Sequence, residues 1–98
     1  MPKVTVRVPH DLDPAAAFAK LQLALEKTVT DFQGHDLAIE GSETASKFTF
    51  KSMAFTIKGR AEASPSEVVV EVELPFAAMM FKDKAERAIT KNVTRALA

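Results

Sequence analysis

Apolar residues recur at every second position along five separate stretches of this 98-residue chain. These stretches are residues 3–8, 37–39, 47–51, 55–62 and 67–74. Because successive side chains of a β-strand point to opposite faces, this alternation predicts strands that each bury one face. Short connections between the last four stretches indicate antiparallel neighbours. The pattern therefore predicts a mostly antiparallel sheet with one apolar face and one wet face.

Two other stretches have the 3.6-residue period of amphipathic helices. Asp13 is a suitable N-cap for the first helix, Pro14 suits its first position, and Gly34 is the expected stop. The second helix is expected to run from about Phe76 to the C-terminus. The order βαββββα predicts an α+β fold of two layers, a mostly antiparallel five-strand sheet with both helices on one face. We expect residues 1–98 to form a single domain.

The apolar positions of these elements predict the composition of the core. It is expected to contain Val6, Phe18, Leu21, Leu25, Phe32, Phe48, Phe50, Ile57, Val70, Val72 and Ile89. The alternate positions of the strands carry mostly Lys, Arg, Glu and Thr, which suit the wet face of the sheet.

The overall composition excludes several classes of protein. Hydrophobic residues make up 47% of the chain and charged residues 27%, with 13 basic against 13 acidic side chains, which is typical of a folded globular protein. The absence of cysteine excludes disulfides, iron–sulfur clusters and thiol nucleophiles. No run of about 18 apolar residues is present, so we expect no transmembrane segment. Without an apolar signal core near the N-terminus, the expected compartment is the cytoplasm.

The two histidines are the most obvious candidates for metal binding or base catalysis. His10 lies near Asp11 and Asp13, but a metal site needs three or four converging ligands, so we expect His10 to order a turn. His35 precedes Asp36, and adjacent residues of an extended chain point to opposite faces. A glycine-rich phosphate loop and a nucleophile elbow are also missing. We therefore expect no catalytic residue, no metal and no cofactor, and a protein that is not an enzyme.

Basic side chains on the wet face of the sheet raise the question of nucleic-acid binding. They are Arg7, Lys47, Lys51, Lys58 and Arg60. Sheets that bind RNA usually add exposed aromatic rings for base stacking, whereas Phe48, Phe50 and Phe55 have the parity of the core. Glu62 and Glu71 also dilute the positive charge. We therefore expect no nucleic-acid partner.

The C-terminal segment is the most informative part of the chain. Residues 74–81 carry no charge, whereas residues 82–98 hold five basic residues against two acidic ones, a net charge of +3. On a wheel continuous with the final helix, Phe76 and Met80 fall away from its apolar face. Either the first turn is phased differently, or it exposes an apolar patch beside a basic stripe, which suits contact with an amphiphilic surface, a partner or a dimer mate. The alternative is that these residues close one end of the core, with the methionines filling irregular gaps. The predicted contact residues are Phe76, Met80, Phe81, Lys84, Arg87, Lys91 and Arg95.

Three pieces of the chain resemble the small polyhydroxyalkanoic acid system proteins, the polyhydroxyalkanoate granule-region family. They are residues 4–12 (VTVRVPHDL), the alternating strand 67–74, and Pro75-Phe76 together with residues 81–89 (FKDKAERAI). The resemblance covers nearly the whole chain. It implies a bacterial, cytoplasmic and granule-associated protein of unknown molecular role, which contacts the surface of a polyester granule or a granule protein.

Two other functions stay open at the level of sequence. One is a ligand-binding module with a cavity between the sheet and the final helix, although bulky inward residues such as Phe48 and Phe50 predict that so small a domain fills itself. The other is a protein-interaction or dimerisation module, including a homodimer, that uses the open sheet face or an edge strand.

Overall fold

A computed structural model describes residues 3–52 and 55–98 of the chain. Its elements are β1 (Lys3–Pro9), α1 (Pro14–Asp31), β2 (Gly34–Gly41), β3 (Ala45–Ser52), β4 (Phe55–Ala63), β5 (Glu67–Glu73), the 3₁₀ helix η1 (Phe76–Phe81) and α2 (Lys82–Leu97). The order βαββββα is confirmed, with the 3₁₀ helix as an added turn before the last helix.

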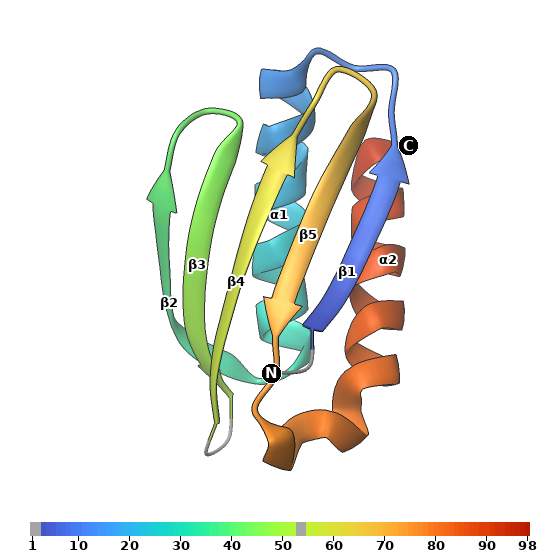
Figure 1. The fold of residues 1–98 in the computed structure, drawn as a ribbon. Coiled ribbons are helices and arrows are strands. Elements are labelled where there is room, and N and C mark those ends of the chain that lie inside the picture. The colour runs from blue at the N-terminus through green and yellow to red at the C-terminus, as the bar shows by residue number, and fades with distance from the viewer. Residues whose placement is uncertain (1–2, 53–54) are drawn as a thin grey trace.

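The five strands form one antiparallel sheet in the order β1-β5-β4-β3-β2. Strands β2 to β5 follow one another as a meander, and β1 closes the far side by pairing with β5, where Val6 lies opposite Val70. Both helices lie on the same face of this sheet (Figure 1), with α2 packed against β1 and against α1. The predicted two-layer α+β architecture is confirmed.

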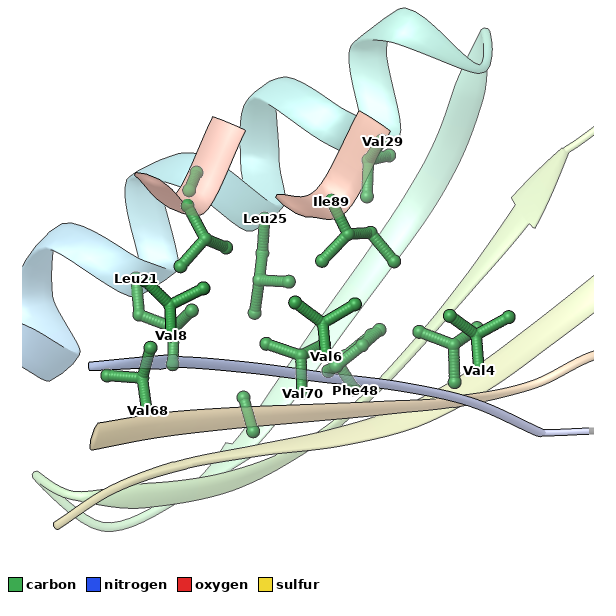
Figure 2. Close-up of a cluster of buried hydrophobic side chains, with 14 of the residues drawn as sticks. Val4, Val6, Val8, Leu21, Leu25, Val29, Phe48, Val68, Val70 and Ile89 are labelled. Carbon is green, nitrogen blue, oxygen red and sulfur yellow. The ribbon is translucent and has the colours of Figure 1, made fainter. Parts of the chain in front are cut away.

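The core lies between the inner face of the sheet and the two helices. Side chains of β1 and β5, such as Val6 and Val70, point toward Leu21 and Leu25 of α1 (Figure 2). Every predicted core residue is buried except Phe32, which is half-buried. Phe32 is the C-cap of α1, so its ring lies at the end of the layer where the helix no longer covers it.

The sequence predicted the start of α1 correctly, but not its end. Asp13 Oδ2 accepts a hydrogen bond from Ala15 N at 3.1 Å, and Pro14 is the first helical residue, as predicted. The expected stop at Gly34 is wrong, because Gln33 takes the left-handed conformation with φ of 56° and Gly34 already begins β2. Gly34 has a packing role instead, since a Cβ there would lie 2.6 Å from Val29 Cγ1 and 2.9 Å from the Phe50 ring.

The outer face of the sheet is wet and carries cross-strand ion pairs. Arg60 donates two hydrogen bonds to Glu71 across the β4–β5 pair, at 2.8 and 3.2 Å, and Arg7 pairs with Glu67 at 2.9 Å. Two of the five basic residues considered for nucleic acid are therefore already paired with carboxylates. The rings of Phe48 and Phe50 lie on the opposite, buried face.

Candidate functional site

The C-terminal segment begins with a tight turn rather than with the α-helix that its sequence predicts. Residues 76–81 form η1, and α2 starts only at Lys82. Pro75 is extended, and its carbonyl accepts from Ala78 N at 2.8 Å, which is the hydrogen bond of a 3₁₀ helix. Helical residues therefore begin at Phe76 as expected, but the first six have the tighter 3₁₀ period instead of the α-helical one.

The 3₁₀ geometry decides which side chains of η1 reach solvent. With three residues per turn, residues i and i+3 share one row along the helix. Ala78 and Phe81 form the row that faces the protein, and Ala78 is buried. The other two rows face outward and expose the apolar tip, which we define as Phe76 (73% exposed), Met79 (46%) and Met80 (80%).

The apolar tip agrees with the sequence prediction in part. Phe76 and Met80 are exposed, as their position on the helical wheel indicated. Phe81 departs from the prediction, because it is half-buried and turned toward the core. Met79 was missed, since an α-helical period groups it with different neighbours than the three-residue period does. In the structure, therefore, Met79 is exposed and Phe81 is not.

The basic stripe, which we define as Lys84, Arg87, Lys91 and Arg95, lies on the exposed side of α2. Among residues 3–52 and 55–98, no ion pair involves any of the four. Lys84 lies over the Phe32 ring, with Nζ 5.7 Å from the ring centre. Asp83 and Glu86 share a shallow surface depression with Arg87 and Lys91, so two carboxylates lie close to the stripe and reduce its positive charge locally.

Behind the apolar tip, the space between the sheet and the helices is not filled. An apolar cavity of about 160 Å³ lies at the end where α1 stops and η1 begins. Figure 1 shows this end, where β2 starts, β3 ends and β4 starts. The lining residues are Leu25, Thr28, Val29, Asp31, Phe32, Gln33, Phe48, Phe50, Ser52, Phe55, Ile57, Val72, Leu74, Ala78, Phe81, Lys84, Ala85 and Ile89.

The expectation that so small a domain fills itself is therefore wrong at this end. The helical wall of the cavity includes Ala78 and Ala85, which have the smallest side chains among the lining residues. The rings of Phe48 and Phe50 stack on each other, 6.4 Å apart and 14° from parallel. Sequence periodicity marks these positions as buried, but it does not show that small and large side chains face each other across an unfilled gap.

Of the two histidines, His35 lies at the start of β2, at this end of the molecule, whereas His10 lies just after β1, at the other end. His10 is buried, and its Nδ1 accepts from Leu12 N at 3.0 Å, so its Nε2 carries the proton donated to Ser64 O at 2.8 Å. It orders the turn, as predicted. His35 contacts Asp36 at 3.1 Å in a β-bulge where Asp36 has φ of 56°, so the prediction of opposite faces is wrong. The side chains of His35 and Asp36 are both exposed.

Comparison with known proteins places the chain in a family. The family model described as "Putative polyhydroxyalkanoic acid system protein" matches residues 4–97. The chain belongs to this family. The match confirms the resemblance found in residues 4–12, 67–74 and 81–89.

In this polyhydroxyalkanoic acid system protein, the three segments that indicate the family are neighbours in space. Residues 4–12 include most of β1, residues 67–74 include β5, and residues 81–89 begin α2. Strands β1 and β5 pair along their whole length, and α2 packs on β1. The three segments on which the resemblance rests therefore form one packed unit of the fold.

A search of curated proteins gave no match. Two solved structures align over the whole chain at low identity. The crystal structure of Ara h 8.0201 is 14% identical, with 98% of this chain and 97% of that chain covered and a TM-score of 0.47. The crystal structure of TTHA0849 from Thermus thermophilus is 11% identical, with 98% and 94% covered and a TM-score of 0.42.

Within residues 3–52 and 55–98, no group of three or more His, Asp or Glu side chains lies close enough to hold a metal ion. In the same part of the chain, neither helix combines the length and the apolar character needed to cross a bilayer.

Proposed function

We propose that this protein is a small non-enzymatic component of polyhydroxyalkanoate storage that attaches to the granule surface in the cytoplasm. The observation that carries the proposal is the apolar tip, where Phe76 and Met80 are 73% and 80% exposed directly before a basic helix. Membership of the polyhydroxyalkanoic acid system family supports a hydrophobic polyester as the occupant.

The expected affinity follows from the sizes of the two contributions. Full burial of a Phe or Met side chain contributes about 1.5–3 kcal/mol. Each basic side chain near an anionic coat contributes about 1 kcal/mol at most, and less in salt. Together they support reversible peripheral attachment rather than irreversible insertion. Salt should weaken this attachment without abolishing it, because burial of the apolar tip is not screened.

The test is sedimentation of the purified protein with isolated polyhydroxyalkanoate granules at low and high salt. We expect Phe76→Ser/Met80→Ser to lose binding at both salt concentrations. Arg87→Glu/Lys91→Glu should bind more weakly than wild type mainly at low salt, where the charges are least screened. Leu23→Ser is the matched control, because Leu23 is 65% exposed on α1 and belongs to neither surface.

The proposal fails if wild type stays in the supernatant or if the tip variant sediments as wild type does while circular dichroism shows it folded. Solution mass at micromolar concentration is measured in parallel. A dimer of the wild type that dissociates in Phe76→Ser/Met80→Ser would assign the tip to self-association and overturn the granule contact.

A further inference from the structure

We propose that the cavity behind the apolar tip is a binding site for an alkyl carboxylate, with the hydrocarbon chain inside and the carboxylate at Lys84. The lining residues come from α1, η1, α2 and the three strands β3 to β5. The cavity therefore depends on the complete fold. It lies on the inner side of η1, opposite the apolar tip, so this proposal does not rest on granule contact.

The size of the cavity suits part of a small organic molecule. At about 160 Å³ it is close to an engineered apolar cavity of about 150 Å³ that stays dry and takes up benzene. The enclosed part of a ligand is therefore expected to be about six carbon atoms, the number in benzene. A longer chain would have to leave through the mouth.

The two hydroxyl groups in the cavity wall already have hydrogen-bond partners, and the other polar side chains of the described lining, Asp31, Gln33 and Lys84, are exposed at its rim. Thr28 Oγ1 donates to Ala24 O at 2.8 Å and accepts from Asn92 Nδ2 at 2.9 Å. Ser52 Oγ donates to Phe32 O at 2.7 Å. A polar group placed inside would lose its water without gaining a hydrogen bond, which is unfavourable. The enclosed part of the ligand must therefore be hydrocarbon.

The charge at the mouth selects the head group. Lys84 lines the cavity and makes no ion pair with any residue that the structure describes. Asp31, the acidic residue at the same rim, is already bound by Asn92 Nδ2 at 3.1 Å and by Lys27 Nζ at 3.6 Å. An anionic head group can therefore pair with Lys84 while the charge of Asp31 is compensated by its own partners. A carboxylate is the smallest common head group of this kind on an alkyl chain.

The experiment titrates the ¹⁵N-labelled protein with octanoate at neutral pH, below the micelle concentration, and follows amide shifts by NMR. We expect saturable shifts at cavity residues such as Val29, Phe50 and Ala85. Octanol, which has the same chain length without the charge, should bind about three- to fivefold more weakly, as loss of one exposed ion pair implies. A parallel titration with 3-hydroxyoctanoate distinguishes a fatty acid from a polyester monomer as the natural source.

Substitutions in the cavity wall and at Lys84 test separately whether the hydrocarbon chain occupies the cavity and whether the carboxylate pairs with Lys84. Ala85→Leu is expected to fill the cavity and abolish the shifts, and Ala78→Leu does the same from η1 if the first variant does not fold. Lys84→Gln is expected to lower the affinity for octanoate about three- to fivefold and to leave the affinity for octanol unchanged. Lys91→Gln is the control on the same helix.

The proposal is overturned if octanoate gives no saturable shifts, if the shifts map to the apolar tip, or if a folded Ala85→Leu variant binds as wild type does. Equal affinity for octanoate and octanol would overturn the carboxylate assignment. Ala85→Leu should still sediment with granules, and Phe76→Ser/Met80→Ser should still bind octanoate. The two proposals can therefore fail separately.

Discussion

Asn92 is the residue that joins the two helices most directly, although it stands on the apolar face of α2. It is 4% exposed, and its Nδ2 donates to Thr28 Oγ1 at 2.9 Å and to Asp31 Oδ2 at 3.1 Å. Both acceptors are on α1, so a single amide fixes how the helices sit on each other. Thr28 and Asp31 also line the cavity, so the hydrogen bonds from Asn92 satisfy polar atoms at its wall.

We expect Asn92→Ala to lower the free energy of unfolding by about 1–3 kcal/mol, because Asp31 and Thr28 lose a donor in a partly buried place. Urea denaturation measures the change. Thr90→Ala is the control, since Thr90 is an exposed residue of the same helix. A loss for Asn92→Ala no larger than that of the control would show that the interhelical contact does not stabilise the fold.

At the scale of elements, the sheet shows how neighbouring strands adapt to each other. Phe48 on β3 lies directly opposite Gly59 on β4, and a Cβ at Gly59 would collide with the Phe48 ring. The glycine therefore makes room for an aromatic ring against the backbone of the next strand. On the outer face, β4 is joined to its other neighbour, β5, by Arg60 and Glu71.

The Arg60–Glu71 pair makes part of the stability depend on pH. The hydrogen bonds from Arg60 hold the pKa of Glu71 below its ordinary value, and the charges of Arg60, Lys3 and Arg7 add to this effect against the opposing effect of burial. A carboxyl with a depressed pKa stabilises the fold above its unfolded value of about 4.3, and this contribution is lost as pH falls through the folded value.

We therefore expect the stability difference between wild type and Glu71→Gln to be constant near neutral pH and to shrink below about pH 4. Urea denaturation at a series of pH values measures it, with Glu86→Gln on α2 correcting for the general change in net charge. A difference that stays constant down to the acid transition, or that grows there, would contradict this prediction.

At the scale of the whole molecule, the first strand completes a sheet whose other four strands lie within residues 34–73. β1 pairs with β5 from Lys3↔Glu73 to Pro9↔Glu67, and α2 packs on β1. These contacts are far apart in the sequence, so the meander and α2 cannot bury their apolar faces fully without residues 3–9. The apolar residues Val68, Val70 and Val72 are the ones that β1 protects.

We expect a chain that begins at residue 13 to lose its cooperative unfolding transition, because the edge of β5 and the inner face of α2 become exposed. Thermal unfolding followed by circular dichroism measures this. A peptide of residues 1–12 added in trans should restore the transition, whereas the same peptide with Val6→Asp should not. A cooperative transition of the shortened chain alone would mean that β1 is dispensable.

The sequence by itself determined the order of the elements, the faces of the strands and the start of α1. These properties depend on local burial, which appears as a period of two or 3.6, and on local capping by Asp13 and Pro14. The family resemblance also came from the sequence, because its segments are contiguous in the chain. The same periodicity placed Phe76 and Met80 away from the apolar face of the final helix, but it left open whether they are exposed.

Only the tertiary structure decided the features of the candidate site. A 3₁₀ turn after Pro75 exchanges Phe81 for Met79 at the surface, and hydrogen bonding to α1 explains why Asn92 is buried. The cavity is lined by the small Ala78 and Ala85 together with the large rings of Phe48 and Phe50, which come from β3, more than 25 positions away in the chain. Periodicity reports whether a side chain is buried, but the volume left between buried side chains depends on which distant residues meet.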